Sequence, residues 1–121
     1  DNLADVVLAF MIEKKGAVDN LEEILSEPAV EMVQWGGADF SMNVGKPRQM
    51  GDPEVAAAKK KTFEVALKMG VPPRAEISSA DEMKEYLDMG VRHFSLGTDI
   101  TILYSFWKNE GEKVLKAMEG Q

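Results

Sequence analysis

Four short apolar runs alternate with four amphipathic segments, and this order limits the possible folds more than any other feature of the sequence. The runs are predicted as strands near residues 5–12, 31–35, 74–77 and 93–97, each followed by a helix. Strict alternation of strands and helices implies a parallel sheet with right-handed crossovers. Two architectures fit: a four-stranded open α/β sheet, or half of a (βα)₈ barrel, which needs about 250 residues when complete.

The ends of the predicted elements are clearest in the middle of the chain. Residues 52–70 are predicted as a helix because Asp52 is a good N-cap, Pro53 suits the first helical position and Gly70 suits the C-terminal cap. The first apolar run, residues 6–12, is typical of a strand that is buried on both faces in a parallel sheet. Both patterns favour a parallel α/β fold.

Two further helices are predicted in the last third of the chain. Ser79 is a candidate N-cap, Glu82 follows three residues later as in a capping box, and Gly90 suits the end of that helix. The last helix begins near Thr98, and Gly111 is a candidate break. Apolar residues occur on more than one of its faces: Ile100, Ile102, Leu103, Phe106 and Trp107. Half a barrel would also expose two sheet edges, so self-association is expected.

Composition excludes several classes of function. The 121 residues carry a formal net charge of −7, which argues against nucleic acid as a partner because phosphate binding needs a basic surface. There is no cysteine and a single histidine, His93, so a metal site would use mainly oxygen ligands, which favours Mg²⁺, Mn²⁺ or Ca²⁺ over zinc. No run approaches the roughly 20 apolar residues of a membrane span, and no signal peptide is visible. A cytoplasmic protein without a membrane partner is expected.

Acidic residues follow or end several predicted strands, where α/β proteins place their working residues. Glu13 follows the first strand, Asp39 follows the second strand and the pair Gly36–Gly37, and Glu76 lies in the third. Acids that converge on one rim are typical of an oxygen-ligand metal site. Glu13 and Asp39 can instead simply favour or cap the start of a helix. Glu76 is either paired, for example with Arg74, or directed into a site.

Other polar residues favour structural roles. Thr98 and Asp99 are expected to cap the last helix. His93 begins its strand, on the side of an α/β fold that serves stability rather than catalysis. The dinucleotide-binding pattern GxGxxG is absent from the sequence.

Three stretches, MIEKKGAVDNLEEIL, VQWGGADFS and GVRHFSLGTDITIL, together resemble the C-terminal half of the HpcH/HpaI aldolase family. That family includes 4-hydroxy-2-oxo acid aldolases and dihydroxyheptenedioate aldolases, and citrate lyase β-subunits are its relatives. The resemblance covers nearly the whole chain, in order and with compatible spacing. It implies that residues 1–121 form a single (βα)₄ unit, the C-terminal half of a TIM (βα)₈ barrel with parallel strands.

The resemblance also implies a site and a reaction. Glu13 and Asp39 would hold a divalent metal, Mg²⁺ or Mn²⁺, and the backbone of Gly37, Ala38 and Asp39 would meet the carboxylate of a small 2-oxo acid such as pyruvate. The implied reaction is cleavage of a 4-hydroxy-2-oxo acid to pyruvate and an aldehyde, with the metal stabilising the enolate.

The family's proton-transfer histidine and its enolate-contacting arginine lie on first-half strands, and no stretch of this chain matches those motifs. No catalytic residue is therefore assigned in this chain. Two interpretations stay open: the metal-binding half of a metal-dependent lyase, expected to be inactive alone, or a non-catalytic half-barrel that binds a metal or assembles with itself. Because family members exchange their final helix between subunits, the resemblance also favours a homo-oligomer.

Overall fold

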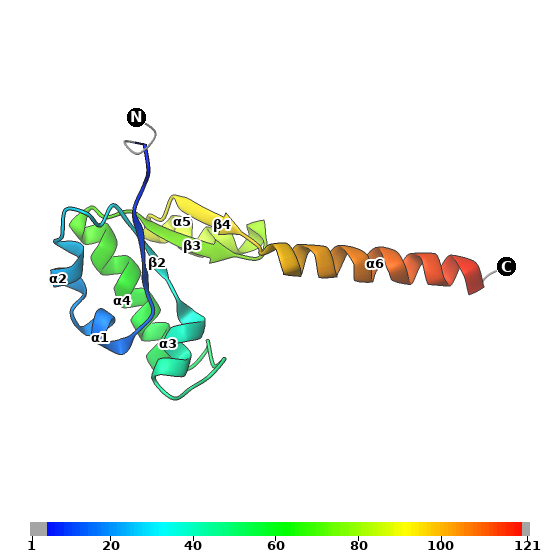
Figure 1. Ribbon diagram of the computed structural model, residues 1–121, viewed down its shortest axis with the longest axis horizontal. Helices are drawn as coiled ribbons and strands as arrows, with labels where there is room; N and C mark the ends of the chain where they lie inside the picture. The colour runs from blue at the N-terminus through cyan, green and yellow to red at the C-terminus, as the bar shows by residue number, and fades with distance from the viewer. Residues whose placement is uncertain (1–4, 120–121) are drawn as a thin grey trace.

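The computed structural model describes residues 5–119 and shows a parallel sheet of four strands connected by helices (Figure 1). The strands lie in the order in which they occur in the chain: β1 (Ala9–Ile12), β2 (Met32–Trp35), β3 (Pro73–Ile77) and β4 (His93–Leu96). Each pair of neighbouring strands is parallel. The predicted α/β alternation with parallel strands is confirmed.

Helical segments follow every strand, and the chain crosses from each strand to its neighbour through them. Their bounds are α1 (Lys15–Asp19), α2 (Leu21–Leu25), α3 (Gly37–Asn43), α4 (Pro53–Met69), the 3₁₀ turn η1 (Ala80–Glu82), α5 (Met83–Met89) and α6 (Asp99–Glu119). Among residues 5–119, no helix combines the length and the apolar character that crossing a membrane requires.

Two apolar cores hold the helices to the sheet. The first joins β1 and β2 to α1, α2 and α4 and includes the fully buried Leu21, Val33 and Val55. The second joins β3 and β4 to α4 and α5 around Phe63, whose ring meets Tyr86 edge-on with 5.6 Å between the centroids. Because α4 contributes to both cores, it connects the two halves of the sheet.

Strand register divides the sheet into an apolar and a polar side, because successive side chains of a strand point to opposite faces. Ile12, Val33 and Ala75 lie on the apolar side and belong to the two cores. On the other side, residues in register on β2, β3 and β4 are polar or charged. We call this side the polar face; it consists of Gln34, Arg74, Glu76, His93 and Ser95.

β1 is shorter and more exposed than the sequence predicted. It begins at Ala9 rather than near residue 5, because β2 begins at Met32, the register partner of Ala9, and residues 5–8 extend beyond it. Only Ile12 is buried, whereas Phe10 and Met11 are 42% and 48% exposed. The prediction of a strand buried on both faces is therefore wrong for β1, which has a neighbouring strand on one side only.

The helix in the middle of the chain has the predicted ends. The Asp52 side chain accepts a hydrogen bond from the Glu54 backbone N–H (2.8 Å), and Gly70 ends α4 in the left-handed conformation with φ of 76°. The segment after β1 is helical as predicted but is interrupted at Asn20, which separates α1 from α2.

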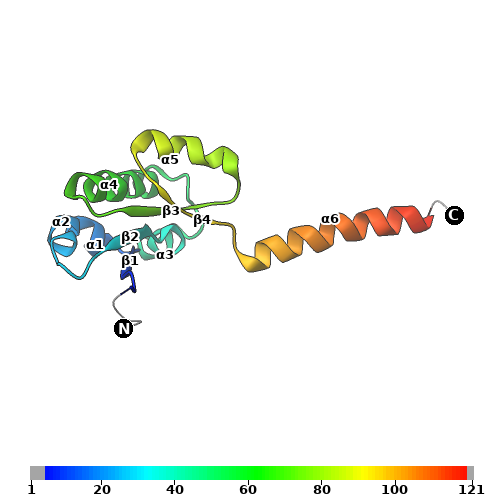
Figure 2. The same cartoon turned by 90° about the horizontal axis from the view of Figure 1, so that it is seen from above.

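The later helices differ from the predicted capping pattern. Ser79 makes no side-chain cap; instead the Glu82 carboxylate accepts a hydrogen bond from the Ser78 backbone N–H (3.2 Å). α6 continues through Gly111 without a break. Figures 1 and 2 show α6 leaving the sheet beyond β4 and extending away from the rest of the chain, and it contains no buried residue.

Candidate functional site

The ends of β1 and β2 are packed directly against each other. The Gly36 backbone N–H donates a hydrogen bond to the Ile12 carbonyl (2.9 Å). A Cβ atom at Gly36 would lie 2.7 Å from Cβ of Glu13 and 2.9 Å from Cγ of Met11, so no larger residue fits without displacing them. The absence of a side chain at this position lets the turn after β2 approach Glu13.

Asp39 lies in the first turn of α3, immediately after that turn, and its side chain is exposed. The buried ring of Phe40 fixes α3 by packing on Trp35, with 4.8 Å between the centroids. The Ser41 hydroxyl donates to the Ala38 carbonyl (2.7 Å), which closes the turn further. The start of this helix is thus held firmly, with Asp39 facing solvent.

Neither acid is the N-cap of its helix, although Glu13 directly precedes the N-cap of α1 and Asp39 lies in the first turn of α3, where a carboxylate favours the positive end of a helix. Lys14 is the N-cap of α1 and Gly36 the N-cap of α3, and neither cap involves a side-chain hydrogen bond. Within residues 5–119, the carboxylates of Glu13 and Asp39 have no hydrogen-bonding or ion-pairing partner. Both side chains are therefore available to a ligand.

Glu76 is held on the polar face by a buried amide. Gln34, which is 4% exposed, donates through Nε2 to Oε1 of Glu76. The Gln34 carbonyl oxygen accepts from the Arg74 guanidinium, through Nη2 and through Nε at 2.7 Å. Glu76 is therefore paired, as one interpretation predicted, but with Gln34, which lies between it and Arg74.

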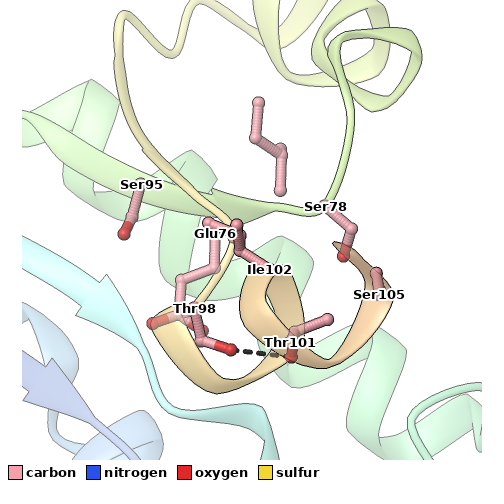
Figure 3. Close-up of a pocket in the computed structure, with 9 residues that line it drawn as sticks. Glu76, Ser78, Ser95, Thr98, Thr101, Ile102 and Ser105 are labelled. Atoms are coloured by element: carbon pink, nitrogen blue, oxygen red, sulfur yellow. Dashed lines mark hydrogen bonds between the residues drawn. The ribbon is translucent and has the colours of Figure 1, made fainter. Parts of the chain in front are cut away.

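A cavity of about 530 Å³ lies where β3 and β4 end and α6 begins (Figure 3). Hydroxyl groups dominate its polar lining, together with one carboxylate: Glu76, Ser78, Ser95, Thr98, Thr101 and Ser105. The hydroxyls of Thr98 and Thr101 lie 2.8 Å apart and share a hydrogen bond. The apolar part of the lining comes from Ile77 and Ile102.

A smaller cavity, about 310 Å³, lies between the turn after β2 and the helices α4 and α5. Gly37 and Ala38 line it on one side, and Lys59 and Tyr86 on another, with the Lys59 Nζ atom 4.6 Å from the centre of the Tyr86 ring. Glu76 lines both cavities. The carboxyl ends of the strands thus carry two neighbouring cavities and the acids Glu13, Asp39 and Glu76.

Comparison with known proteins places this arrangement in a family. A protein-family model described as HpcH/HpaI aldolase/citrate lyase matches residues 2–105. The chain belongs to the HpcH/HpaI aldolase/citrate lyase family. A 4-hydroxy-2-oxo-heptane-1,7-dioate aldolase from Escherichia coli is 33% identical over 92 residues, which cover 76% of this chain and 35% of the relative. The corresponding protein of Klebsiella pneumoniae is 32% identical over the same length.

Solved structures show the same fold. The chain superposes on the citrate synthase SbnG with a TM-score of 0.86 and 24% identity, over 92% of this chain and 45% of that one. An HpcH/HpaI aldolase from Desulfitobacterium hafniense gives a TM-score of 0.81 and 24% identity, over 93% and 43%. The predicted half of a TIM-type barrel is confirmed as the fold. The chain spans about a third of the length of the curated relatives that it matches.

The structure of this family member brings together only some of the residues that the sequence singled out. Glu13 and the turn that precedes Asp39 meet at the ends of β1 and β2. His93 is exposed at the first residue of β4, and Asp99 uses its carboxylate to accept from the Ile100 N–H (2.7 Å) at the start of α6. Within residues 5–119, no cluster of three or more His, Asp or Glu side chains has a metal-binding arrangement.

Sequence reasoning missed Gln34 and the hydroxyl groups of the larger cavity. Gln34 lies in an otherwise apolar run between Val33 and Trp35, and a lone polar residue inside a buried strand was a signal that could have pointed to it. Ser95 and Ser105 are distant in sequence from Glu76. Strand register places Ser95 beside Glu76, and the start of α6 brings Ser105 to the same cavity.

Proposed function

We propose that this chain is the metal-binding half of a lyase that cleaves 4-hydroxy-2-oxo acids to pyruvate and an aldehyde. In this proposal, residues 1–121 form a single (βα)₄ unit that corresponds to the C-terminal half of the aldolase barrel. The observation that carries it is the close packing of Glu13 on Gly36, where an added Cβ atom would lie only 2.7 Å from Cβ of Glu13, so that one free carboxylate lies beside the turn that leads to another. The aldolase names of the curated relatives support the reaction class.

Glu13 and Asp39 are the proposed ligands of a Mg²⁺ or Mn²⁺ ion. Both acids follow the carboxyl ends of neighbouring strands, and both are at least partly accessible. Carboxylate oxygens are the donors that these ions prefer. Two carboxylates leave most coordination positions to water or substrate oxygens, which Mg²⁺ tolerates well. A bound ion would supply Lewis-acid stabilisation for negative charge on the 2-oxo oxygen.

The backbone of Gly37, Ala38 and Asp39 is the proposed contact for the substrate carboxylate. The first hydrogen bond within α3 runs from the Phe40 N–H to the Gly36 carbonyl (2.9 Å). The three preceding N–H groups therefore have no acceptor inside the helix. Side chains are small or absent at Gly37 and Ala38, so a small 2-oxo acid can reach these donors.

Catalysis by the chain alone is expected to be slight. A positioned proton-transfer group typically contributes about 10²–10⁴-fold to a rate. The single histidine, His93, lies at the amino end of β4, whereas Glu13 and Asp39 follow the carboxyl ends of their strands. The chain therefore supplies ligands and substrate contacts, while proton transfer is left to groups outside it. A non-catalytic half-barrel that binds a metal is the alternative function.

A second copy of the chain is the proposed partner for α6. Large apolar side chains on this helix are more than half exposed, including Trp107 at 69% and Ile100 at 74%. Stable monomers rarely expose so many apolar residues in one continuous element. A homo-oligomer in which α6 packs on a neighbouring subunit would bury them.

Calorimetric titration of Mn²⁺ in the presence of oxalate, an unreactive analogue of a 2-oxo acid, tests the metal site. The wild-type protein is expected to bind Mn²⁺ more tightly with oxalate than without it, because oxalate supplies two further oxygen ligands. Asp39→Asn should lose most of this binding, whereas Asp81→Asn, which removes the same charge from an exposed position of η1, should not. Equal binding by wild type and Asp39→Asn would remove Asp39 from the site.

An assay of pyruvate release from a 4-hydroxy-2-oxo acid separates the two functions. Little release by the chain alone, with restored release when the remaining part of a family barrel is added, supports a lyase half. Full activity of the isolated chain would contradict the proposed division of roles. Metal and oxalate binding without release in any combination would favour the non-catalytic alternative.

A further inference from the structure

The larger cavity has an unusual balance of polar groups for a site that would receive an acid. Five hydroxyl side chains and one carboxylate provide its polar lining: Ser78, Ser95, Thr98, Thr101, Ser105 and Glu76. Lysine, arginine and histidine are absent from its lining residues in the described chain. A ligand here meets groups that both donate and accept hydrogen bonds, but it meets no positive charge.

Glu76 is the fixed element of this lining. Its Oε1 accepts from the buried Gln34 amide, which the Arg74 guanidinium holds in turn through Nε at 2.7 Å. Its second oxygen, Oε2, has no hydrogen-bonding partner within residues 5–119. Figure 3 shows Glu76 among the residues that line the cavity, beside the start of α6.

The surroundings of the cavity add negative charge. The Glu82 carboxylate accepts from the Ser78 N–H (3.2 Å), and the Asp99 carboxylate accepts from the Ile100 N–H (2.7 Å), next to Thr98. Both acids adjoin lining residues. A ligand with a carboxylate at this position would therefore face like charges with no cation among the lining residues of the described chain, because the Arg74 guanidinium lies behind Gln34; this arrangement disfavours binding.

We propose that this cavity receives the aldehyde portion of the substrate and that this portion is uncharged and hydroxylated. The name of the curated relatives describes a 1,7-dioate, whose distal end is a second carboxylate. The cavity of this chain instead offers hydroxyl partners and Glu76 as an acceptor for a ligand hydroxyl. Its volume of about 530 Å³ is within the usual range for small-ligand sites. The aldehyde assignment rests on the proposed function; the preference for a neutral polyol does not.

Isoleucine methyl NMR of the full chain can test the preference. The sequence has five isoleucines, and two of them, Ile77 and Ile102, line the cavity. Ile12 and Ile24 belong to or pack on the first core and serve as internal controls. The probes are three four-carbon molecules of different charge: erythritol, succinate and putrescine. They are added without metal, so binding does not depend on the Glu13 and Asp39 site.

Millimolar erythritol is expected to shift the methyl resonances of Ile77 and Ile102 in a saturable way. Succinate is expected to bind at least about tenfold more weakly. Glu76→Gln should narrow that difference to within about threefold, because it removes the charge and keeps the shape. Glu64→Gln, which removes the same charge from the exposed surface of α4, should leave it unchanged. Ser105→Ala should weaken the binding of erythritol by about three- to tenfold, because one hydrogen bond to the ligand is lost.

The outcomes separate this inference from the metal site. Succinate or putrescine binding as tightly as erythritol, or no shift with erythritol, would overturn the polyol assignment even if Mn²⁺ and oxalate bind as expected. Polyol binding with loss of discrimination in Glu76→Gln supports the assignment even if the metal titration fails. In that case the cavity would be a polyol site outside the proposed aldolase reaction.

Discussion

The two longest helices, α4 and α6, differ in burial: α4 packs on the sheet, whereas α6 has no buried residue along its whole length. α4 spans 17 residues and buries five of them: Val55, Ala58, Thr62, Phe63 and Ala66. α6 spans 21 residues and buries none, although it carries several aromatic and aliphatic side chains. Both carry apolar residues of the kind that pack on a partner. The difference is that the partner of α4 is the sheet of its own chain, whereas none of the described elements covers α6.

The largest expected effect is on the free energy of unfolding, which should depend much more on a buried side chain of α4 than on an exposed side chain of α6. Phe63 is 1% exposed and sits between β3 and α5, whereas Phe106 is 55% exposed on α6. Phe63→Ala should reduce the free energy of unfolding by about 3–5 kcal/mol through lost burial and the resulting cavity. Phe106→Ala should change it by less than about 0.5 kcal/mol in dilute, monomeric protein. Urea unfolding followed by circular dichroism measures both.

Protein concentration is the control for this pair. If α6 packs on a second copy, the effect of Phe106→Ala grows as the protein is concentrated, while that of Phe63→Ala stays nearly constant. Equal and large effects of both substitutions in dilute monomer would mean that α6 folds back onto its own chain, in contradiction to the absence of any buried residue in that helix.

The same contrast explains what the sequence could and could not predict. The ends of α4 were predictable because Asp52, Pro53 and Gly70 act within one turn of the helix end. The apolar residues on more than one face of α6 were visible too, but the partner that covers them is not encoded in any local pattern. Likewise, Gln34 and Glu76 are 42 residues apart in sequence, and only the strand register brings them into contact.

The candidate site divides in the same way. Glu13 and Asp39 could be named because each follows its strand within a short, distinctive stretch, and the structure brings Glu13 against the Gly36 turn. The burial of β1 was mispredicted because its apolar composition does not reveal that it lies at a sheet edge. The composition of a strand indicates what it can bury, while its position in the sheet determines what it does bury.

The second prediction concerns association through α6. Trp107 is 69% exposed near the middle of the helix, and tryptophan is a frequent energetic centre of protein interfaces. Trp107→Glu should weaken self-association by roughly 30-fold, equivalent to about 2 kcal/mol. Sedimentation velocity over a range of concentrations measures the change.

Asn109→Glu is the matched control for Trp107→Glu. It adds the same single negative charge two positions along α6 without removing apolar surface, and Asn109 is also exposed. Its association constant should stay close to that of wild type. A similar loss in both variants would assign the effect to charge repulsion, and a monomeric wild type would refute the assembly through α6.

The smallest expected effect concerns the starts of the two helices, where only α4 has an ion pair that makes stability depend on pH. At the start of α4, the Asp52 carboxylate accepts from the Lys46 ammonium (2.8 Å) and from the Glu54 N–H (2.8 Å). The hydrogen bond from Lys46 lowers the pKa of Asp52 below its usual value, and the hydrogen bond to Asp52 raises the pKa of Lys46. α6 begins with the paired hydroxyls of Thr98 and Thr101 and with no such ion pair in the described chain.

The signs of these shifts set the pH dependence. Because the pKa of Asp52 is lower in the folded state, its stabilising contribution is complete above the ordinary aspartate value of about 4 and is lost as the pH falls through the folded pKa. Because the pKa of Lys46 is raised, its contribution is complete below the ordinary lysine value of about 10.4 and is lost as the pH rises above it. Stability from this pair is therefore constant around neutral pH.

Asp52→Asn isolates the charge, because asparagine caps helices about as well as aspartate. The variant should have a slightly lower urea midpoint than wild type at pH 7. The two midpoints should begin to converge as the pH falls below about 4, the ordinary aspartate value, and should meet once the pH has passed below the lowered pKa of folded Asp52. Added salt should reduce the difference at pH 7 because both side chains are near the surface. A difference that persists unchanged at low pH and high salt would show that the start of α4 depends on cap geometry rather than on the ion pair, and the contrast with α6 would then rest on packing alone.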